Sequence, residues 1–157
     1  MDTIVVGVDG SPGSDAALRW ALEEARLREA AVRVVHAYQV PQTAPADAGV
    51  GIVGPTHQPV FSAEDLERIQ AAAEKESQGV IETSLEQAGE AARGLTIESA
   101  PLAGPPAETL IAAGRDAALL VLGTRGHGGF MGLLLGSVSQ QLAQHPPCPV
   151  VILPPEE

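Results

Sequence analysis

Mostly apolar runs alternate along the chain with longer segments in which apolar residues recur every three or four positions. Residues 3–9 form the first run, which is rich in β-branched residues and is typical of a strand buried on both faces. The same reading predicts four further strands, at 32–37, 95–99, 117–122 and 150–153.

Helical spacing or helix boundary signals fill the intervals between these strands. Ser11 or Ser14 can cap the first helix, which we expect to end near Ala30. One face of this helix holds Ala17, Leu18, Ala21, Leu22 and Ala25. The other three helices are expected from Ser62 to about Ala92, from Pro105-Pro106 to near Gly114, and from about Ser137 to Gln144.

Strict alternation of strands and helices predicts an α/β fold. We expect a single domain over residues 1–157, built on an open five-stranded parallel sheet with helices on both faces. Residues 39–61 are rich in Pro, Gly and Ala, which predicts a long mobile loop rather than a domain boundary. If the first and fourth strands are neighbours, the strand order is 3-2-1-4-5 and their carboxyl ends form one cleft.

The composition agrees with a parallel sheet and narrows the class of partner. Hydrophobic residues make up 45% of the chain but aromatics only 3%, so the core must consist of Val, Leu, Ile and Ala. A net charge of −11 without a basic stripe argues against nucleic acid and anionic membranes. We expect a cytoplasmic protein, because the first residues lack the features of a signal peptide and no apolar run could span a membrane. Cys148 stands alone and is expected to be a small buried hydrophobe.

Glycines after the fourth strand form a pattern that points to a phosphate-binding loop. Gly123, Gly126 and Gly136 are separated by two and nine residues, and Ser137 follows at the start of a helix. Glycine lets a ligand approach the backbone, such turns can aim successive N–H groups at an anion, and a helix N-terminus favours phosphate. A flexible turn is the alternative, but the position between an apolar strand and a helix favours the phosphate loop.

The first strand also ends in polar chemistry, at Asp9. This carboxylate could bind a ribose or a Mg²⁺ ion through water, or it could cap the first helix. Arg125 and His127 could contact phosphate or could be solvated loop side chains.

These segments together resemble the ATP-binding branch of the universal stress protein family. The resemblance rests on Gly-x2-Gly-x9-Gly-Ser at 123–137, on GVDGS at 7–11, on VVHA at 34–37, and on GSV at 136–138 running into CPVVI at 148–152. It covers almost the whole chain apart from 39–61. It implies a Rossmann-like fold of the adenine nucleotide alpha hydrolase kind, with ATP as the ligand, accompanied by Mg²⁺.

The resemblance also implies which residues hold the nucleotide. The end of the first strand and the backbone near Ala37 would hold the adenine and ribose, and Gly123 would lie against the ribose. Ala37 stands where many relatives carry valine, which leaves more room beside the adenine. The following loop would wrap the phosphates. The residues expected at the site are Gly7, Val8, Asp9, Ala37, Gly123, Thr124, Arg125, Gly126, His127, Gly128, Gly129, Gly136, Ser137 and Val138.

The family further implies a homodimer, formed when the last strand, Val150 to Leu153, pairs across a two-fold axis. An exposed apolar edge strand independently favours such pairing.

The predicted site holds little of the charge that phosphoryl transfer needs. It contains no lysine, no Gly-Lys pair of the Walker kind occurs, and the His-x-Gly-His signature of related nucleotidyltransferases is absent. We therefore expect a nucleotide-dependent sensor or regulator of the stress response, with at most slow ATP hydrolysis and no catalytic residue. The alternatives are a slow ATPase or nucleotidyl-transfer enzyme, a structural or chaperone-like dimer without nucleotide, and a flavin-binding domain, which the scarcity of aromatics disfavours.

Overall fold

The computed structural model describes residues 1–40, 62–127, 132 and 134–156. The expected loop at 39–61 and the expected site residues Gly128 and Gly129 therefore lie wholly or largely outside the described residues. In chain order the elements are β1 (Thr3–Gly7), α1 (Pro12–Arg28), β2 (Ala31–Tyr38), α2 (Ala63–Ala88), a 3-10 helix (Gly89–Ala92), β3 (Ile97–Ala103), α3 (Pro106–Gly114), β4 (Leu119–Gly123), α4 (Ser137–Gln144) and β5 (Val150–Leu153).

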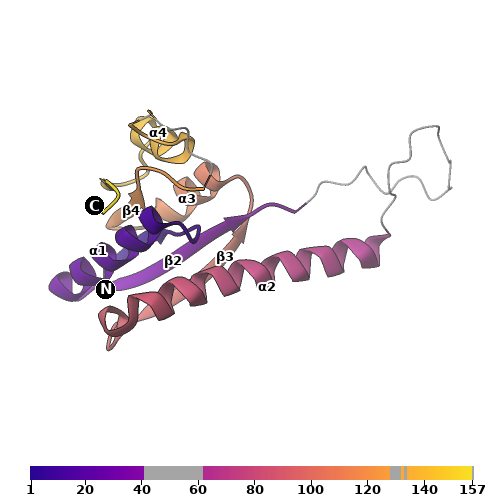
Figure 1. The fold of residues 1–157 in the computed structure, drawn as a ribbon, viewed down its shortest axis with the longest axis horizontal. Helices are drawn as coiled ribbons and strands as arrows, with labels where there is room; N and C mark the ends of the chain where they lie inside the picture. The colour runs from indigo at the N-terminus through magenta and orange to yellow at the C-terminus, as the bar shows by residue number, and fades with distance from the viewer. Residues whose placement is uncertain (41–61, 128–131, 133, 157) are drawn as a thin grey trace.

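The five strands form one parallel sheet in the order β3-β2-β1-β4-β5, which confirms the predicted fold class and strand order (Figure 1). Strand β1 lies in the middle, between β2 and β4. The winding direction of the sheet therefore reverses at β1, and the carboxyl ends of β1 and β4 become neighbours, as is needed for a ligand cleft.

Helices α1 and α2 pack on one face of the sheet, and α3 and α4 pack on the other. Successive side chains of a strand point to opposite faces, so Ile4 and Val6 join the cluster under α1 while Val5 joins the cluster under α3 and α4. This two-sided burial explains why the central strands are apolar at almost every position.

Strand β3 runs from Ile97 to Ala103, which corrects the expected strand at 95–99. The observed strand continues through Pro101, which has no N–H to donate to a neighbouring strand. Thr96 accepts the Val32 N–H and Gly104 donates to the Tyr38 carbonyl, so even-numbered residues of this strand face β2. Pro101 therefore turns its nitrogen away from β2, at the edge of the sheet, where proline is tolerated.

Strand β1 ends at Gly7, two residues earlier than predicted, because the chain turns at Gly10 to enter α1. The Ser11 hydroxyl caps this helix by accepting the Ser14 N–H over 3.3 Å, so Ser11 is the N-cap. The helix ends at Arg28 rather than near Ala30, because Glu29 adopts a left-handed conformation with φ of 53°.

Two smaller expectations also change. Strand β4 begins at Leu119 rather than at Ala117, because Ala117 still belongs to the turn that leaves α3 and donates its N–H to the Gly114 carbonyl. Cys148 is half-buried rather than buried, at the margin of the core under α3 and α4, and this burial raises the pKa of its thiol.

None of the helices in the part of the chain that the structure describes has the length and apolar character that a membrane span requires.

Candidate functional site

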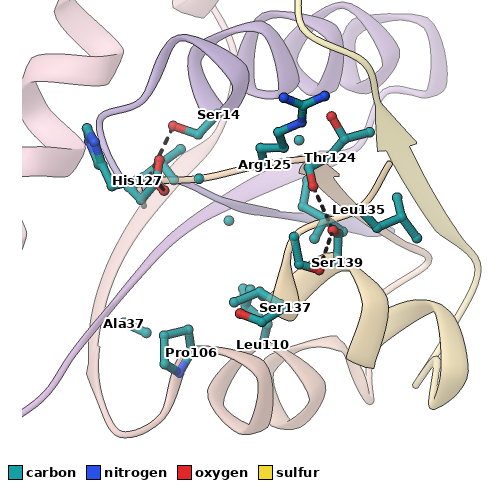
Figure 2. Close-up of a pocket in the computed structure, with 18 of the residues that line it drawn as sticks. Ser14, Ala37, Pro106, Leu110, Thr124, Arg125, His127, Leu135, Ser137 and Ser139 are labelled. Carbon is teal, nitrogen blue, oxygen red and sulfur yellow. Dashed lines mark hydrogen bonds between the residues drawn. The ribbon is translucent and has the colours of Figure 1, made fainter. Parts of the chain in front are cut away.

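A cleft of about 750 Å³ opens at the carboxyl ends of β1, β2 and β4, over the starts of α3 and α4 (Figure 2). This volume is within the range typical of small-molecule and cofactor sites. Every expected site residue that the structure describes lines this cleft. They are Gly7, Val8, Asp9, Ala37, Gly123, Thr124, Arg125, Gly126, His127, Gly136, Ser137 and Val138.

The backbone of Ala37 faces one end of the cleft. Pairing between β1 and β2 ends after Gly7 and Val35, with the Val8 N–H donating to the Val35 carbonyl over 2.9 Å. Because backbone groups alternate in direction along a strand, the N–H and C=O of Ala37 face the same side as those of Val35. Among the described residues, neither group has a hydrogen-bond partner. The cleft therefore contains an adjacent donor and acceptor on a rigid strand.

Apolar side chains line the cleft near this backbone edge. Pro106 and Leu110, from the start of α3, lie beside Ala37 and Ser137 in Figure 2. Leu110 also approaches the main chain of Gly7, where an added Cβ would meet its Cδ1 at 3.1 Å. Apolar surface next to a donor and an acceptor suits a flat heterocycle with polar edges.

The other end of the cleft is formed by the start of α4. The Gly136 N–H donates to the Thr124 carbonyl over 2.6 Å, and the buried Ser139 hydroxyl donates to the same carbonyl over 2.8 Å. No side chain caps α4, and among the described residues the N–H groups of Ser137 and Val138 have no partner. Free N–H groups at a helix start attract anions, so this end of the cleft suits phosphate.

Asp9 connects the end of β1 to the loop after β4. One carboxylate oxygen accepts the Ser11 N–H over 2.9 Å, and the other accepts the His127 N–H over 2.9 Å. Burial would raise the pKa of Asp9, but hydrogen bonds from Ser11, His127 and Ser14 outweigh it and hold the pKa below its ordinary value. The carboxylate is thus ionised at neutral pH.

His36 and Arg125 both line the cleft, but His36 is half-buried whereas Arg125 is exposed. The His36 Nδ1 lies 2.7 Å from the Oγ of Ser77, a buried residue of α2, and burial lowers the pKa of this histidine against the opposing effect of Asp9 and Glu76. Arg125 is exposed and forms no ion pair within the described part of the chain. Among the described residues, no three His, Cys, Asp or Glu side chains converge as a metal site would require.

Sequence comparison decides the family. A family profile described as "Universal stress protein family" matches residues 1–154. The chain belongs to the universal stress protein family. Universal stress protein Rv1996 of Mycobacterium tuberculosis is 37% identical over 156 residues, which are 98% of this chain and 48% of that protein. The chain spans about half the length of the curated relatives it matches.

Solved universal stress proteins share the fold. A universal stress protein in complex with cAMP is 28% identical, with a TM-score of 0.61 over 97% of this chain and 95% of that one. The universal stress protein from Archaeoglobus fulgidus in complex with dAMP is 24% identical, with a TM-score of 0.54 over 97% of each chain. At 24% identity, the likeness to the dAMP complex supports the fold alone.

The universal stress protein cleft also contains residues that sequence reasoning missed. Some lie inside helices and strands whose motifs carry no ligand signal, and their place depends on which elements meet at the cleft. Ser139 is the clearest example. A serine in the first turn of a helix gives no ligand signal in the sequence, and only the structure shows that its hydroxyl donates to the Thr124 carbonyl. The other missed lining residues are Ser14, Val35, His36, Pro106, Leu110, Leu122, Leu135 and Gln140.

Proposed function

We propose that this universal stress protein binds ATP in the cleft and acts as a nucleotide-dependent regulator of the stress response, with at most slow ATP hydrolysis. One observation carries the proposal: a single cleft joins the backbone edge of Ala37 to the start of α4, and among the described residues neither group of N–H donors has a partner. A purine nucleotide needs this combination, a polar edge with apolar walls for the base and N–H groups for the phosphates.

The edge at Ala37 matches adenine in particular. Adenine presents an amino donor next to a ring acceptor, and Ala37 offers a C=O acceptor and an N–H donor toward the cleft. The solved relative in complex with cAMP carries an adenine base, which supports an adenine nucleotide as the ligand class. We infer that Gly7, Val8 and Gly123 border the ribose, and that the residues after Gly123 and those at the start of α4 surround the phosphates.

The charges favour binding over catalysis. Arg125 is the one cation on the described lining that is charged at all physiological pH values, and the lining contains no lysine. Phosphoryl transfer usually relies on several cations and a group that positions the nucleophile. We therefore propose a binding protein, with a slow ATPase or nucleotidyl-transfer enzyme as the alternative. A turnover of several ATP molecules per second with Mg²⁺ would favour the enzyme.

Released ligand gives the direct test. Freshly purified protein is denatured and its small molecules are identified by mass spectrometry, and refolded or ligand-free protein is titrated with ATP by calorimetry. We expect an adenine nucleotide in the first experiment or saturable binding in the second. Failure of both would exclude the proposal and would favour the nucleotide-free, chaperone-like dimer.

A substitution at Ala37 tests the base site itself. Ala37→Pro removes the N–H that faces the cleft, while pairing with β3 remains, because the backbone groups of Ala37 point away from β3. Ala37→Val is the matched control, since it changes the side chain and retains the N–H. We expect the proline variant to lose about tenfold or more in ATP affinity and the valine variant to stay within about threefold. Equal losses in both variants would show that the backbone edge does not bind the base.

A further inference from the structure

Asp9 has both of its carboxylate oxygens engaged by backbone N–H groups from two distant segments. The Ser11 N–H donates to Oδ1 and the His127 N–H donates to Oδ2, each over 2.9 Å. The Asp9 N–H in turn donates to the Ser14 hydroxyl over 3.2 Å, which ties the residue to the first turn of α1. We call the pair of bonds from Ser11 and His127 to the carboxylate the Asp9 bridge.

Gly126 lies directly against this bridge. A Cβ added to Gly126 would lie 2.1 Å from Oδ2 of Asp9, well inside the distance at which carbon and oxygen repel. The loop backbone therefore passes over the carboxylate at a distance that only glycine allows. The glycine at 126 is explained by this contact with Asp9, without any ligand present.

The loop after β4 is held at a second point. The Thr124 carbonyl accepts the Gly136 N–H over 2.6 Å and the Ser139 hydroxyl over 2.8 Å. Residues 124–127 are thus attached to α4 at one end and to the end of β1 at the other. Their backbone direction is set by these bonds before any phosphate arrives, and preorganisation of this kind raises affinity by lowering the ordering cost of binding.

We propose that Asp9 is a positioning residue, which binds nucleotide indirectly by holding the loop 124–127 in its binding conformation through the His127 N–H and the Gly126 backbone. The proposal rests on the proposed function, since it concerns the same cleft. It differs from the expectation that Asp9 itself binds Mg²⁺ or ribose. Both carboxylate oxygens already accept backbone N–H groups, so the structure accounts for this carboxylate without an ion.

A cycle of variants separates these two roles. In the native background, Gly126→Ala forces its methyl group into the carboxylate and should weaken ATP binding by about tenfold or more. In an Asp9→Ala background the carboxylate is gone, so the same Gly126→Ala change should cost about threefold or less. If the two losses simply multiply, Asp9 and Gly126 act independently and the proposal is wrong.

ATP affinity measured with and without magnesium gives a second test. A positioning role predicts that Asp9→Ala weakens ATP binding by the same factor with Mg²⁺ and with EDTA, and that it weakens AMP binding similarly. A loss confined to the titration with Mg²⁺ would instead identify Asp9 as a ligand of the ion. Asp9→Asn is the milder variant if Asp9→Ala fails to fold, because its amide oxygen can still accept one of the two N–H groups.

Hydrogen exchange of the His127 amide tests the bridge without nucleotide. Loss of a bond to a charged acceptor should speed exchange of this amide by about tenfold or more in Asp9→Ala. The matched control is Asp116→Asn, an exposed carboxylate just before β4 at the opposite end of the sheet, and it should leave the exchange unchanged. If native protein binds no adenine nucleotide, the proposed function fails while this measurement still tests the bridge, and unchanged exchange would overturn it.

Discussion

Gly123 and Gly13 approach each other so closely that a Cβ on Gly123 would lie 2.8 Å from the Gly13 carbonyl oxygen. Gly123 ends β4 and Gly13 lies in the first turn of α1, so the contact joins the central sheet to the helix that follows β1. The Gly13 side has little room too, because its own Cβ would lie 3.0 Å from the Arg125 carbonyl oxygen. The glycine at 123 is therefore required for packing, although the residue also lines the cleft.

We expect Gly123→Ala to destabilise the fold by about 1–3 kcal/mol. The new methyl group would meet the Gly13 carbonyl, and that carbonyl is part of the backbone and cannot move aside alone. The matched control is Gly79→Ala, at a glycine in the middle of α2 whose added Cβ would meet no atom within 4 Å. That control should gain about 0.5–1 kcal/mol, because alanine favours helix more than glycine does. Urea unfolding measures both. Native stability in Gly123→Ala would contradict the close packing.

The Ser139 hydroxyl is expected to support both stability and binding. Its residue is 2% exposed, and its hydroxyl donates to the Thr124 and Gly136 carbonyls. Ser139→Ala should cost about 1 kcal/mol in unfolding free energy and should weaken ATP binding, because Thr124 loses one of its two ties to α4.

Ser84→Ala is the control for that prediction. Ser84 is also buried, but its hydroxyl donates to Asp15 between α1 and α2, outside the cleft lining. It should show a stability loss of similar size with native ATP affinity. If both variants bind ATP equally well, Ser139 has no part in shaping the site.

His36 predicts a decline in stability on mild acidification. Burial lowers its folded pKa from the ordinary 6.5, against the opposing charges of Asp9 and Glu76. The unfolded chain therefore binds a proton first as the pH falls, so stability is lost from about pH 6.5 downward, toward the folded pKa. Unfolding free energy should fall between about pH 7.5 and about pH 5.5, and His36→Asn should reduce that slope. An equal slope in the variant would assign the effect to other groups.

Strand β5 lies at one edge of the sheet, so one row of its backbone groups faces away from β4. Leu120 donates to the Pro149 carbonyl and Thr124 donates to the Leu153 carbonyl, so odd-numbered residues of this segment face β4. By alternation, the backbone groups of Val150 and Ile152 face away from the sheet. These are the groups that a second copy would pair with in the homodimer that the family resemblance implies.

We expect a dimer in light scattering, and we expect Ile152→Pro to be a monomer, since proline removes an outward N–H while the bonds to β4 remain. Ile152→Ala loses the same packing against the core but retains the N–H, and it should stay dimeric. A dimeric proline variant would place the interface elsewhere.

The order of elements could be predicted from the pattern because each strand of this sheet is covered on both faces. Continuous apolar runs such as the one from Ile4 to Val6 fit few other environments, and the helices between them have clear periodicity or boundary signals. Boundaries were less predictable. The predicted third strand ended at Ser99, whereas β3 continues through Pro101, whose missing N–H is dispensable because β3 lies at the edge of the sheet.

By itself, the sequence determined the alternation of strands and helices, and with it the fold class, and the glycine-rich segment after β4. Those features are encoded locally, in apolar periodicity and in the positions of glycine. Only the tertiary structure decided what the loop contacts. Asp9 and His127 are 118 residues apart, and their bond depends on β1 and β4 being neighbours in the sheet. Within the described part of the chain, the backbone of Ala37 likewise has no partner on its β1 side because β1 ends before it, which no single strand's sequence records.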